Sequence, residues 1–375
     1  MTTIISSLSA VQISKLSTST IAGLTSADVN ALDSTKIKAL SSAQLAALTT
    51  ANLALLSSDD VRAISVSAVK GLTLDQISVL STTQLSGLSA GQVVALYTSQ
   101  VDALSTAQLE SLNSTQVASL SSAQLATLGS ADIAVFSSDD INAISAKALA
   151  GLTTATLAGL NSTNAVGLSK AQIASMSSAQ LGALSSNALA TLSSDEVKAI
   201  STKALAGLTA SNLSTDNIAN LTQQQVAALS TTQLAAMTTT QLAALTSSQV
   251  AGLTNAQLGA LSSDKLNVFS SSEIAALSTK ALAGLTTTAL SGLSSDVAVG
   301  LSKAQIASMS SAQLGALSSN ALATLSSDEV KAISTKALAG LTASNLSTDN
   351  IANLTQQQVA ALSTTQLAAM TTTQL

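Results

Sequence analysis

Pairs of adjacent acidic residues recur along the chain and could supply oxygen ligands for Ca²⁺. They are Asp59-Asp60, Asp139-Asp140, Asp195-Glu196 and Asp328-Glu329. No D-x-D-x-D-G loop or glycine-rich nonapeptide accompanies them, and each pair falls at the same place in a short repeat. Carboxylates at that place would lie in the first turn of a helix, where they stabilise free N–H groups. We therefore predict that the pairs cap helices and that the chain has no metal site.

The many serines invite a comparison with serine hydrolases. A nucleophilic serine needs an adjacent base and an oxyanion hole. Since the sequence contains no His and no Cys, lysine is the base that remains, and the pairs Ser169-Lys170 and Ser302-Lys303 are copies within a repeat. The glycines form no phosphate-binding motif. We expect no catalytic residues, no cofactor-binding residues and no enzymatic activity.

The remaining charges are expected to lie at the surface. Three lysines follow acidic residues at a distance of eight positions, and ion pairs between them would each contribute under about 1 kcal/mol. These pairs are Lys147 with Asp139, Lys203 with Asp195, and Lys336 with Asp328. Arg62, the only arginine, is predicted to be a solvated side chain.

Regular rows of hydroxyl side chains could also bind ice or carbohydrate. An ice lattice favours a strict choice of Thr, whereas these rows mix Ser with Thr. Capping of short helices explains both residues, because either hydroxyl accepts a hydrogen bond from a free backbone N–H.

The composition excludes several classes of protein. Cys, His, Trp and Pro are absent, charged residues make up 9% and aromatic residues 1% of the 375 residues, and the net charge is −5. Disulfide frameworks and zinc fingers are therefore excluded, and the acidic balance argues against nucleic acid as a partner. Ser and Thr interrupt every apolar run well before the roughly 18 residues of a membrane span, so no membrane insertion is expected.

A large apolar residue recurs every eight positions and defines an octad repeat. These anchors run from Leu8 to Leu208, resume after a five-residue step at Leu213, and resume again after a second such step from Leu341 to Leu346. Numbering each octad from its anchor, position 2 is nearly always Ser or Thr, position 5 is frequently Gln, position 6 is Leu, Ile or Val, and position 8 is usually Ala or Gly. Ala165 and Ala298 depart from the rule at position 6.

Three secondary structures could accommodate a period of eight residues. In one continuous α-helix, eight residues leave an excess of about 80° per octad, so the apolar stripe would circle the helix. In a strand, positions 1 and 6 would face opposite sides, and Gln and Ala are poor strand residues. In a short helix, Ser or Thr at position 2 and Gln at position 5 form a capping box, and position 6 and the next anchor share one face.

The third alternative predicts an all-α solenoid of very short helices of about two turns, one for each octad. One octad cannot fold alone, because burying two aliphatic side chains gives roughly 3–6 kcal/mol, while ordering eight backbone residues costs about 8–16 kcal/mol. We therefore expect successive helices to wind into a superhelix with Leu, Ile and Val lining the interior. We also expect three or four octads per coil, a number that the octad spacing does not fix. We expect an amino-terminal arm over residues 1–7 and one continuous solenoid over 8–375.

Two further features concern the length of the array. The steps at 208–213 and 341–346 are expected to bend or dislocate the solenoid, either as a hinge or as a tolerated deletion copied by duplication. Residues 165–242 recur identically as 298–375, at an offset of 133, which indicates recent duplication. The chain stops inside an octad, which suggests a segment of a longer array.

The runs LSSAQLAALTTANLALL, LSTAQLESLNSTQVASL and LTSSQVAGLTNAQLGAL resemble octapeptide-repeat arrays of large bacterial secreted or surface proteins described as adhesin-like. The resemblance implies an extracellular rod, spacer or fibre-forming segment at the cell surface. The lack of a Sec signal and of Cys is similar to substrates of type I secretion. The alternative is a binding module for a glycan, a peptide or another rod, and self-association into filaments is a further expectation.

Overall fold

The computed structural model describes residues 3–374, and all the regular secondary structure in this part of the chain is helical. It contains forty-four α-helices and three 3₁₀-helices, η1 to η3, and no strand. The chain divides into two compact units, one ending at Leu192 and the other beginning at Ser193. This confirms the predicted all-α class.

The helices of the first unit are α1 (Ile4–Ser7), α2 (Ala10–Ser14), α3 (Thr18–Ala22), α4 (Ser26–Val29), α5 (Ser34–Lys38), α6 (Ser42–Ala47), α7 (Thr50–Leu53), α8 (Ser58–Ala63), η1 (Val69–Gly71), α9 (Leu74–Val79), α10 (Thr82–Gly87), α11 (Ala90–Ala95), α12 (Thr98–Asp102), α13 (Thr106–Glu110), α14 (Ser114–Ala118), α15 (Ser122–Leu125), α16 (Ser130–Ala134), α17 (Ser138–Ala143), α18 (Ala146–Leu149), α19 (Thr154–Leu157), α20 (Ser162–Ala165), α21 (Lys170–Ser175), α22 (Ser178–Gly182) and α23 (Ser186–Ala190).

The helices of the second unit are α24 (Ser194–Ala199), α25 (Thr202–Leu205), η2 (Ala210–Asn212), α26 (Thr215–Asn220), α27 (Gln223–Ala228), α28 (Thr231–Ala236), α29 (Thr239–Ala243), α30 (Ser247–Ala251), α31 (Asn255–Gly259), α32 (Ser263–Leu266), α33 (Ser271–Ala276), α34 (Thr279–Leu282), α35 (Thr287–Ser291), α36 (Ser295–Ala298), α37 (Lys303–Ser308), α38 (Ser311–Gly315), α39 (Ser319–Ala323), α40 (Ser327–Ala332), α41 (Thr335–Leu338), η3 (Ala343–Asn345), α42 (Thr348–Ala352), α43 (Gln356–Ala360) and α44 (Thr364–Ala368).

From α2 onward, each α-helix follows a cap at position 2 of its octad, begins at position 3 and ends before the next anchor. In α6, the Ser41 hydroxyl accepts from the Gln44 N–H, and Gln44 Oε1 accepts from the Ser41 N–H at 2.9 Å. Leu48 then takes an extended backbone (φ −62°, ψ 136°) and turns the chain toward the next cap. The predicted capping box is confirmed here and in many other octads. The helices have four to six residues, between one and two turns.

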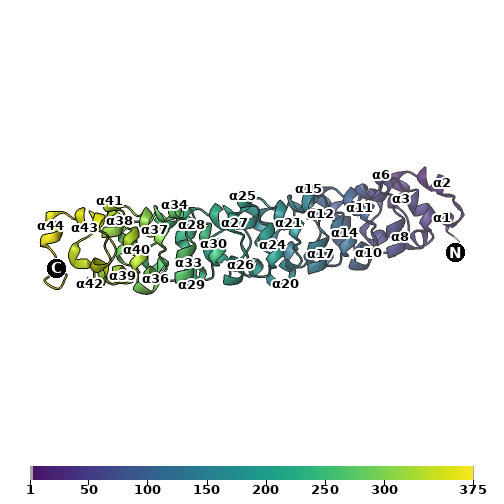
Figure 1. Ribbon diagram of the computed structural model, residues 1–375. Helices are drawn as coiled ribbons and strands as arrows, with labels where there is room; N and C mark the ends of the chain where they lie inside the picture. Colours follow the sequence, from purple (N-terminus) through teal and green to yellow (C-terminus); the bar gives the residue numbers. More distant parts are fainter. Residues whose placement is uncertain (1–2, 375) are drawn as a thin grey trace. The chain divides into compact units, whose positions relative to one another are not determined.

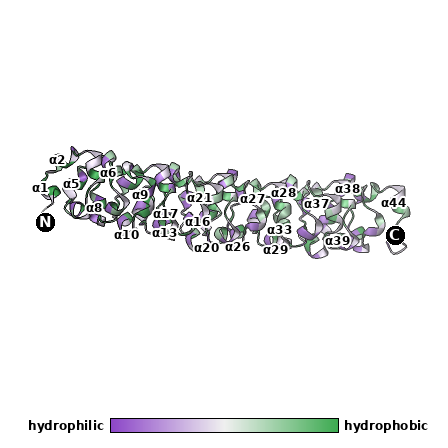
Figure 2. Ribbon diagram, turned by 180° about the vertical axis from the view of Figure 1, so that it is seen from behind, coloured by the Kyte–Doolittle hydropathy of each residue, from purple (hydrophilic) through white to green (hydrophobic). Residues whose placement is uncertain are grey.

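The interior is lined by positions 1 and 6. Position 6 is fully buried at Ile37, Leu45 and Leu53, and anchors such as Leu40 and Leu48 are 3% exposed. In Figure 2, most of the short helices carry both apolar residues (green) and hydrophilic residues (purple), which agrees with one buried and one exposed face per helix. Burial of these two positions confirms the predicted interior.

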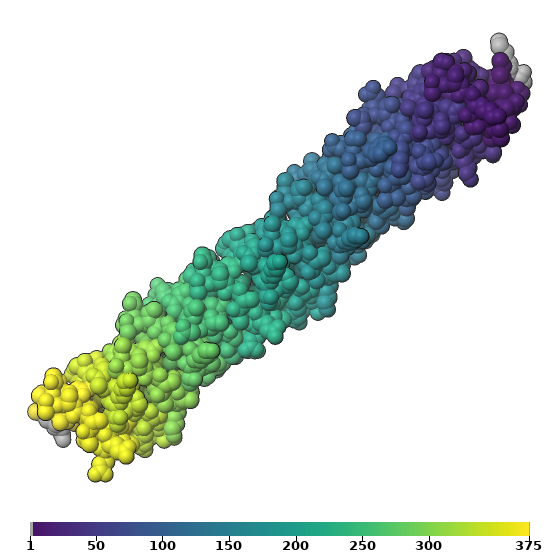
Figure 3. All heavy atoms as spheres, turned by 90° about the horizontal axis from the view of Figure 1, so that it is seen from above, coloured from purple at the N-terminus to yellow at the C-terminus, as the bar shows by residue number. Residues whose placement is uncertain are grey.

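Each coil contains three helices. Helix α2 packs against α5, α5 against α8, and α16 against α19, so a helix meets the one that lies three elements later in the chain. In unbroken octads this spacing is 24 residues, as from Ala10 to Ser34 at the starts of α2 and α5. Within each unit, stacked helices therefore come from neighbouring stretches of sequence (Figure 1), and the colours of the space-filling view succeed one another in order (Figure 3). Nearest-neighbour stacking of this kind defines a solenoid.

Glutamine at position 5 joins each coil to the one before it. Besides capping its own helix, Gln116 donates from Nε2 to the carbonyl oxygens of Leu85 (2.8 Å) and Leu88 (2.7 Å). We call these inter-coil bonds the glutamine ladder. Its members are Gln44, Gln76, Gln84, Gln92, Gln100, Gln108, Gln116, Gln124, Gln172 and Gln180 in the first unit, and Gln225, Gln233, Gln241, Gln249, Gln257, Gln305, Gln313, Gln358, Gln366 and Gln374 in the second.

Other polar residues replace glutamine at position 5 in several octads. Asn52 donates to the Leu24 carbonyl at 2.7 Å, and Thr156 donates to the Leu128 carbonyl at 2.6 Å. The ammonium groups of Lys36 and Lys265 also reach carbonyls of the preceding coil. The requirement at this position is therefore a donor that reaches the main chain one coil back.

A second type of octad has Ala at position 5 and Gly at position 8. In the octads of Ala148 and Ala337, the glycines Gly151 and Gly340 lie against the backbone of Ser122 and Ser311 in the preceding coil, where an added Cβ would overlap the serine carbonyl. Glycine is needed there because no side chain fits.

The five-residue steps do not interrupt the glutamine ladder, so the expected dislocation is not seen in these bonds, while the expected bend stays a prediction. In each step a single 3₁₀ turn, η2 or η3, replaces one α-helix, and η2 packs against α28 as an ordinary helix of the coil would. Gln225 bonds to Val197 and Ile200, at offsets of 28 and 25 residues instead of 31 and 28, so the coil has lost three residues and kept its contacts. Residues 210–213 thus fill the place of a shortened octad.

The amino-terminal end also contributes to the packing. The expected arm, 1–7, includes α1, which is capped by Thr3, buries Ile5 and packs against α4. Residues 1 and 2 lie outside the described range. Whether 8–375 forms one continuous solenoid stays a prediction.

Candidate functional site

The acidic pairs lie at helix starts. The second carboxylate of each pair accepts from the N–H of its capping serine, as Asp140 does from Ser137 (3.0 Å) and Glu196 from Ser193 (2.7 Å). The same arrangement holds for Asp60 and Glu329. Capping is therefore what the pairs do in the structure. Among residues 3–374, no three His, Cys, Asp or Glu side chains gather in a way that could hold a metal ion.

The predicted ion pairs of Lys147, Lys203 and Lys336 are wrong. In the described part of the chain, the ion pair that forms joins Lys36 Nζ to Asp33 Oδ2 at 3.4 Å. The expected pairs fail because helices stack at 24 residues, which places residues eight apart on different sides of a coil.

Asp33 shows how a carboxylate caps a helix in this fold. The Lys36 N–H donates to Asp33 Oδ1 at 2.9 Å, and this hydrogen bond lowers the pKa of Asp33 from its ordinary value of 3.8. The side chain of Lys36 acts in the same direction. Hydrogen bonds to the ionised form are the cause of the shift.

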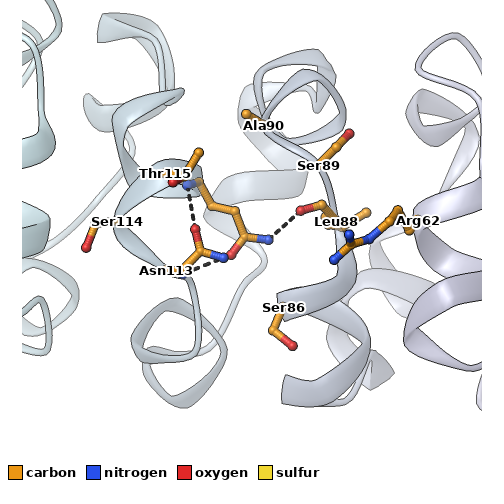
Figure 4. Close-up of a pocket in the computed structure, with 9 residues that line it drawn as sticks. Arg62, Ser86, Leu88, Ser89, Ala90, Asn113, Ser114 and Thr115 are labelled. Atoms are coloured by element: carbon orange, nitrogen blue, oxygen red, sulfur yellow. Dashed lines mark hydrogen bonds between the residues drawn. The ribbon is translucent and has the colours of Figure 1, made fainter.

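An open pocket of about 500 Å³ lies where three successive coils turn from one helix to the next (Figure 4). Arg62 reaches it from the end of α8, Ser86 and Ser89 line its floor, and Asn113 and Thr115 come from the start of α14 on the other side. Arg62 Nε donates to the Gly87 carbonyl at 3.3 Å, which leaves the terminal guanidinium nitrogens available. Hydroxyl, amide and guanidinium groups suit a polar or anionic ligand.

A second pocket, of about 520 Å³, occupies the equivalent place two coils later. It is lined by Glu110, Ala134, Ser137, Asn161 and Thr163, each 48 residues after its counterpart in the first pocket. Arg62 is thereby replaced by Glu110, so the two pockets share one geometry and differ in charge. Asp140, which is 8% exposed, adds a second carboxylate to this pocket.

Arg62 and Glu110 are both at position 7, a position that our sequence reasoning left unassigned. A signal for it exists in the sequence. In the first unit position 7 carries charged side chains at Lys38, Arg62, Lys70, Asp102 and Glu110, whereas Ala occupies it in many octads of both units, such as those of Ala118 and Ala219. Variation at one exposed position within a uniform repeat indicates that this surface differs along the array.

The other pockets have no such pairing. One, of about 320 Å³, contains Lys70 and the exposed Tyr97, whose ring centroid lies 6.0 Å from the Lys70 ammonium. The other, of about 450 Å³, lies in the second unit beside Lys280. Tyr97 occupies position 2 without donating or accepting a side-chain cap, so its octad lacks a hydroxyl that most others have.

None of the helices described is long and apolar enough to cross a bilayer. No curated protein sequence matches the chain. The ALTTAQ repeat family matches residues 21–58, 93–130, 218–255 and 226–263. These segments lie in both units and contain the capped octads described above. The chain is an array of short helical repeats, and these stretches of it are similar to the ALTTAQ repeat.

Proposed function

We propose that the array is a non-enzymatic structural spacer within a secreted or surface protein of a bacterium. The observation that carries the proposal is the use of position 5: in octad after octad it bonds to the preceding coil, in both units. These bonds attach each coil to the one before it, so that every added coil extends the array. The octapeptide resemblance supports the extracellular location.

The spacer proposal predicts that length grows by a constant increment per coil. Stacked helices are spaced by about 8–10 Å, so removing three coils (72 residues) should shorten the particle by about 24–30 Å. Small-angle scattering of the chain and of variants lacking one, two or three coils measures this increment. A maximum dimension that does not change with coil number would overturn the proposal.

A binding module is the second candidate. The repeated polar pockets with different charges favour it, because a spacer alone has no need of charge variation at one position. Self-association into filaments is a third outcome. Sedimentation velocity of the chain alone distinguishes it from the spacer and from the binding module.

A further inference from the structure

The two equivalent pockets of the first unit belong to one continuous feature of the fold. Helices α5, α8, α10, α13 and α16 stack on one another in that order, and each ends at position 7 or 8 of its octad. The line of corners that follows these ends is called the edge groove here, and the pockets at Arg62 and Glu110 are two segments of it.

Charge changes sign along the edge groove. Lys38 and Arg62 lie at one end, Ser86 follows one coil later, and Glu110 lies one coil beyond Ser86, with Asp140 beside it. All of the position 7 side chains among them are exposed. Neither Arg62 nor Glu110 takes part in an ion pair with another of the residues 3–374. A cationic site and an anionic site are therefore both open to an external ligand.

From this we propose that the edge groove binds an extended peptide that carries an acidic and a basic residue, and this proposal rests on the second candidate function. The acidic side chain pairs with Arg62, whose terminal nitrogens form a fork for carboxylates, and the basic side chain pairs with Glu110. An acidic glycan fits less well, since Glu110 and Asp140 would repel it. The hydroxyls and amides between the two charges supply partners for a peptide backbone.

The spacing of the coils sets the spacing of the peptide's charges. Arg62 and Glu110 are two coils apart, and stacked helices are about 8–10 Å apart, so the two sites are separated by roughly 16–20 Å. An extended chain advances about 3.3 Å per residue, which places the two charged residues about five or six positions apart.

The test uses arrayed dodecapeptides that each contain one Glu and one Lys at every separation and in both orders, probed with the labelled full chain. We expect a maximum at about five or six positions in one of the two orders. Arg62→Gln and Glu110→Gln should each weaken the selected peptide about tenfold or more, because each removes one charge-assisted pair. The double variant Arg62→Glu with Glu110→Arg should move the maximum to the reverse order.

Lys198→Gln is the matched control, because Lys198 is an exposed position 7 lysine of the second unit, and it should leave binding unchanged. Circular dichroism of each variant checks the helical content. Binding that ignores separation, or that falls equally in Lys198→Gln, overturns the proposal. A sialylated or sulfated oligosaccharide that binds the chain, loses affinity in Arg62→Gln and gains it in Glu110→Gln also overturns it. The spacer proposal is unaffected by these outcomes, because its test measures length.

Discussion

Glutamine at position 5 satisfies backbone groups of two coils with one side chain. Its Oε1 accepts from the capping residue of its own helix, and its Nε2 donates to two carbonyls of the coil before. These carbonyls belong to a position 6 residue, which also accepts from the N–H of the following anchor, and to that anchor, whose carbonyl lies beyond the helix end. Other residues could replace Gln if it served only as a cap. Gln recurs at this position because one side chain both caps its own helix and bonds to the preceding coil.

We predict that Gln116→Leu is much more destabilising than Gln12→Leu. Both variants lose a capping box, but only Gln116 bonds to a preceding coil. Leucine at 116 leaves the buried Leu88 carbonyl without a donor, while the Leu85 carbonyl keeps the Leu88 N–H, and this should cost about 1–3 kcal/mol beyond the loss in Gln12→Leu. Urea unfolding of both variants measures the difference. Equal losses would show that the inter-coil bonds contribute nothing to stability.

The lowered pKa of Asp33 predicts a loss of stability in acid. A carboxylate whose pKa is lower in the folded state contributes stability at pH values above its unfolded pKa of about 3.9, and the contribution disappears as pH falls through the folded pKa. We expect the Asp33 carboxyl to titrate below 3.8 by NMR. In Asp33→Asn, which keeps a capping side chain, the part of the acid transition that is due to this group should vanish. A titration midpoint at or above 3.8 would contradict the assignment.

At the scale of the helix, local signals decide where each element starts and stops. The capping boxes and the interior positions follow from the sequence, since each depends on spacing within an octad, whereas the number of octads per coil does not. The bonds of Gln116 to Leu85 and Leu88 could not be predicted in this way, because they depend on how coils stack, and eight-residue spacing alone does not fix that. For the same reason the lysine ion pairs were misplaced.

Neither the structure of the five-residue steps nor the edge groove was predicted from the sequence, and the reasons differ. A three-residue deletion would break a stack of long helices, but here η2 still supplies a buried Ala210 and the anchor Leu213. The candidate site requires Arg62 and Glu110 to lie on one line of corners, which becomes apparent only once the coil is known to contain three helices. Variation at position 7 was the available signal.

Glycine at position 8 should be essential only where the coils approach closely. We predict that Gly151→Ala destabilises the protein by about 1–3 kcal/mol, because its Cβ would overlap the Ser122 carbonyl. The matched variant Gly23→Ala should be neutral or slightly stabilising, since its Cβ would meet no atom closer than 3.5 Å. Thermal unfolding distinguishes them, and equal melting temperatures would contradict the close approach.

At the scale of the whole molecule, stability comes from contacts between successive coils. Helices pair with those three elements away, and the ladder reaches back by 25–31 residues. The folding of either unit therefore resembles the extension of a stack, in which each added coil repeats the interactions of the last. The effect of an insertion or deletion on the fold therefore depends less on its length than on whether it adds or removes whole coils.

We predict that deleting one whole coil, Leu221–Ala244, preserves the fold, whereas deleting Leu221–Thr232 does not. The first change removes three octads and leaves every donor opposite a carbonyl. The second removes half a coil, so an anchor of the interior is replaced by a residue of the surface. Circular dichroism and amide hydrogen exchange across residues 193–260 compare the two variants. If both retain equal protection, coil phase is not what holds this region together.

The duplicated block has a consequence that arises from counting helices in threes. Helix α40 is the seventeenth element after its identical copy α24, and seventeen is not a multiple of three. Accordingly, α24 stacks with α26, while α40 stacks with α37, which belongs to another column of the second unit. Lys198 and Lys331, the same residue in the two copies, thus point in different directions around the axis. Duplication has therefore given the protein two identical surfaces that face different directions. A single partner that approaches from one side cannot bind both of them.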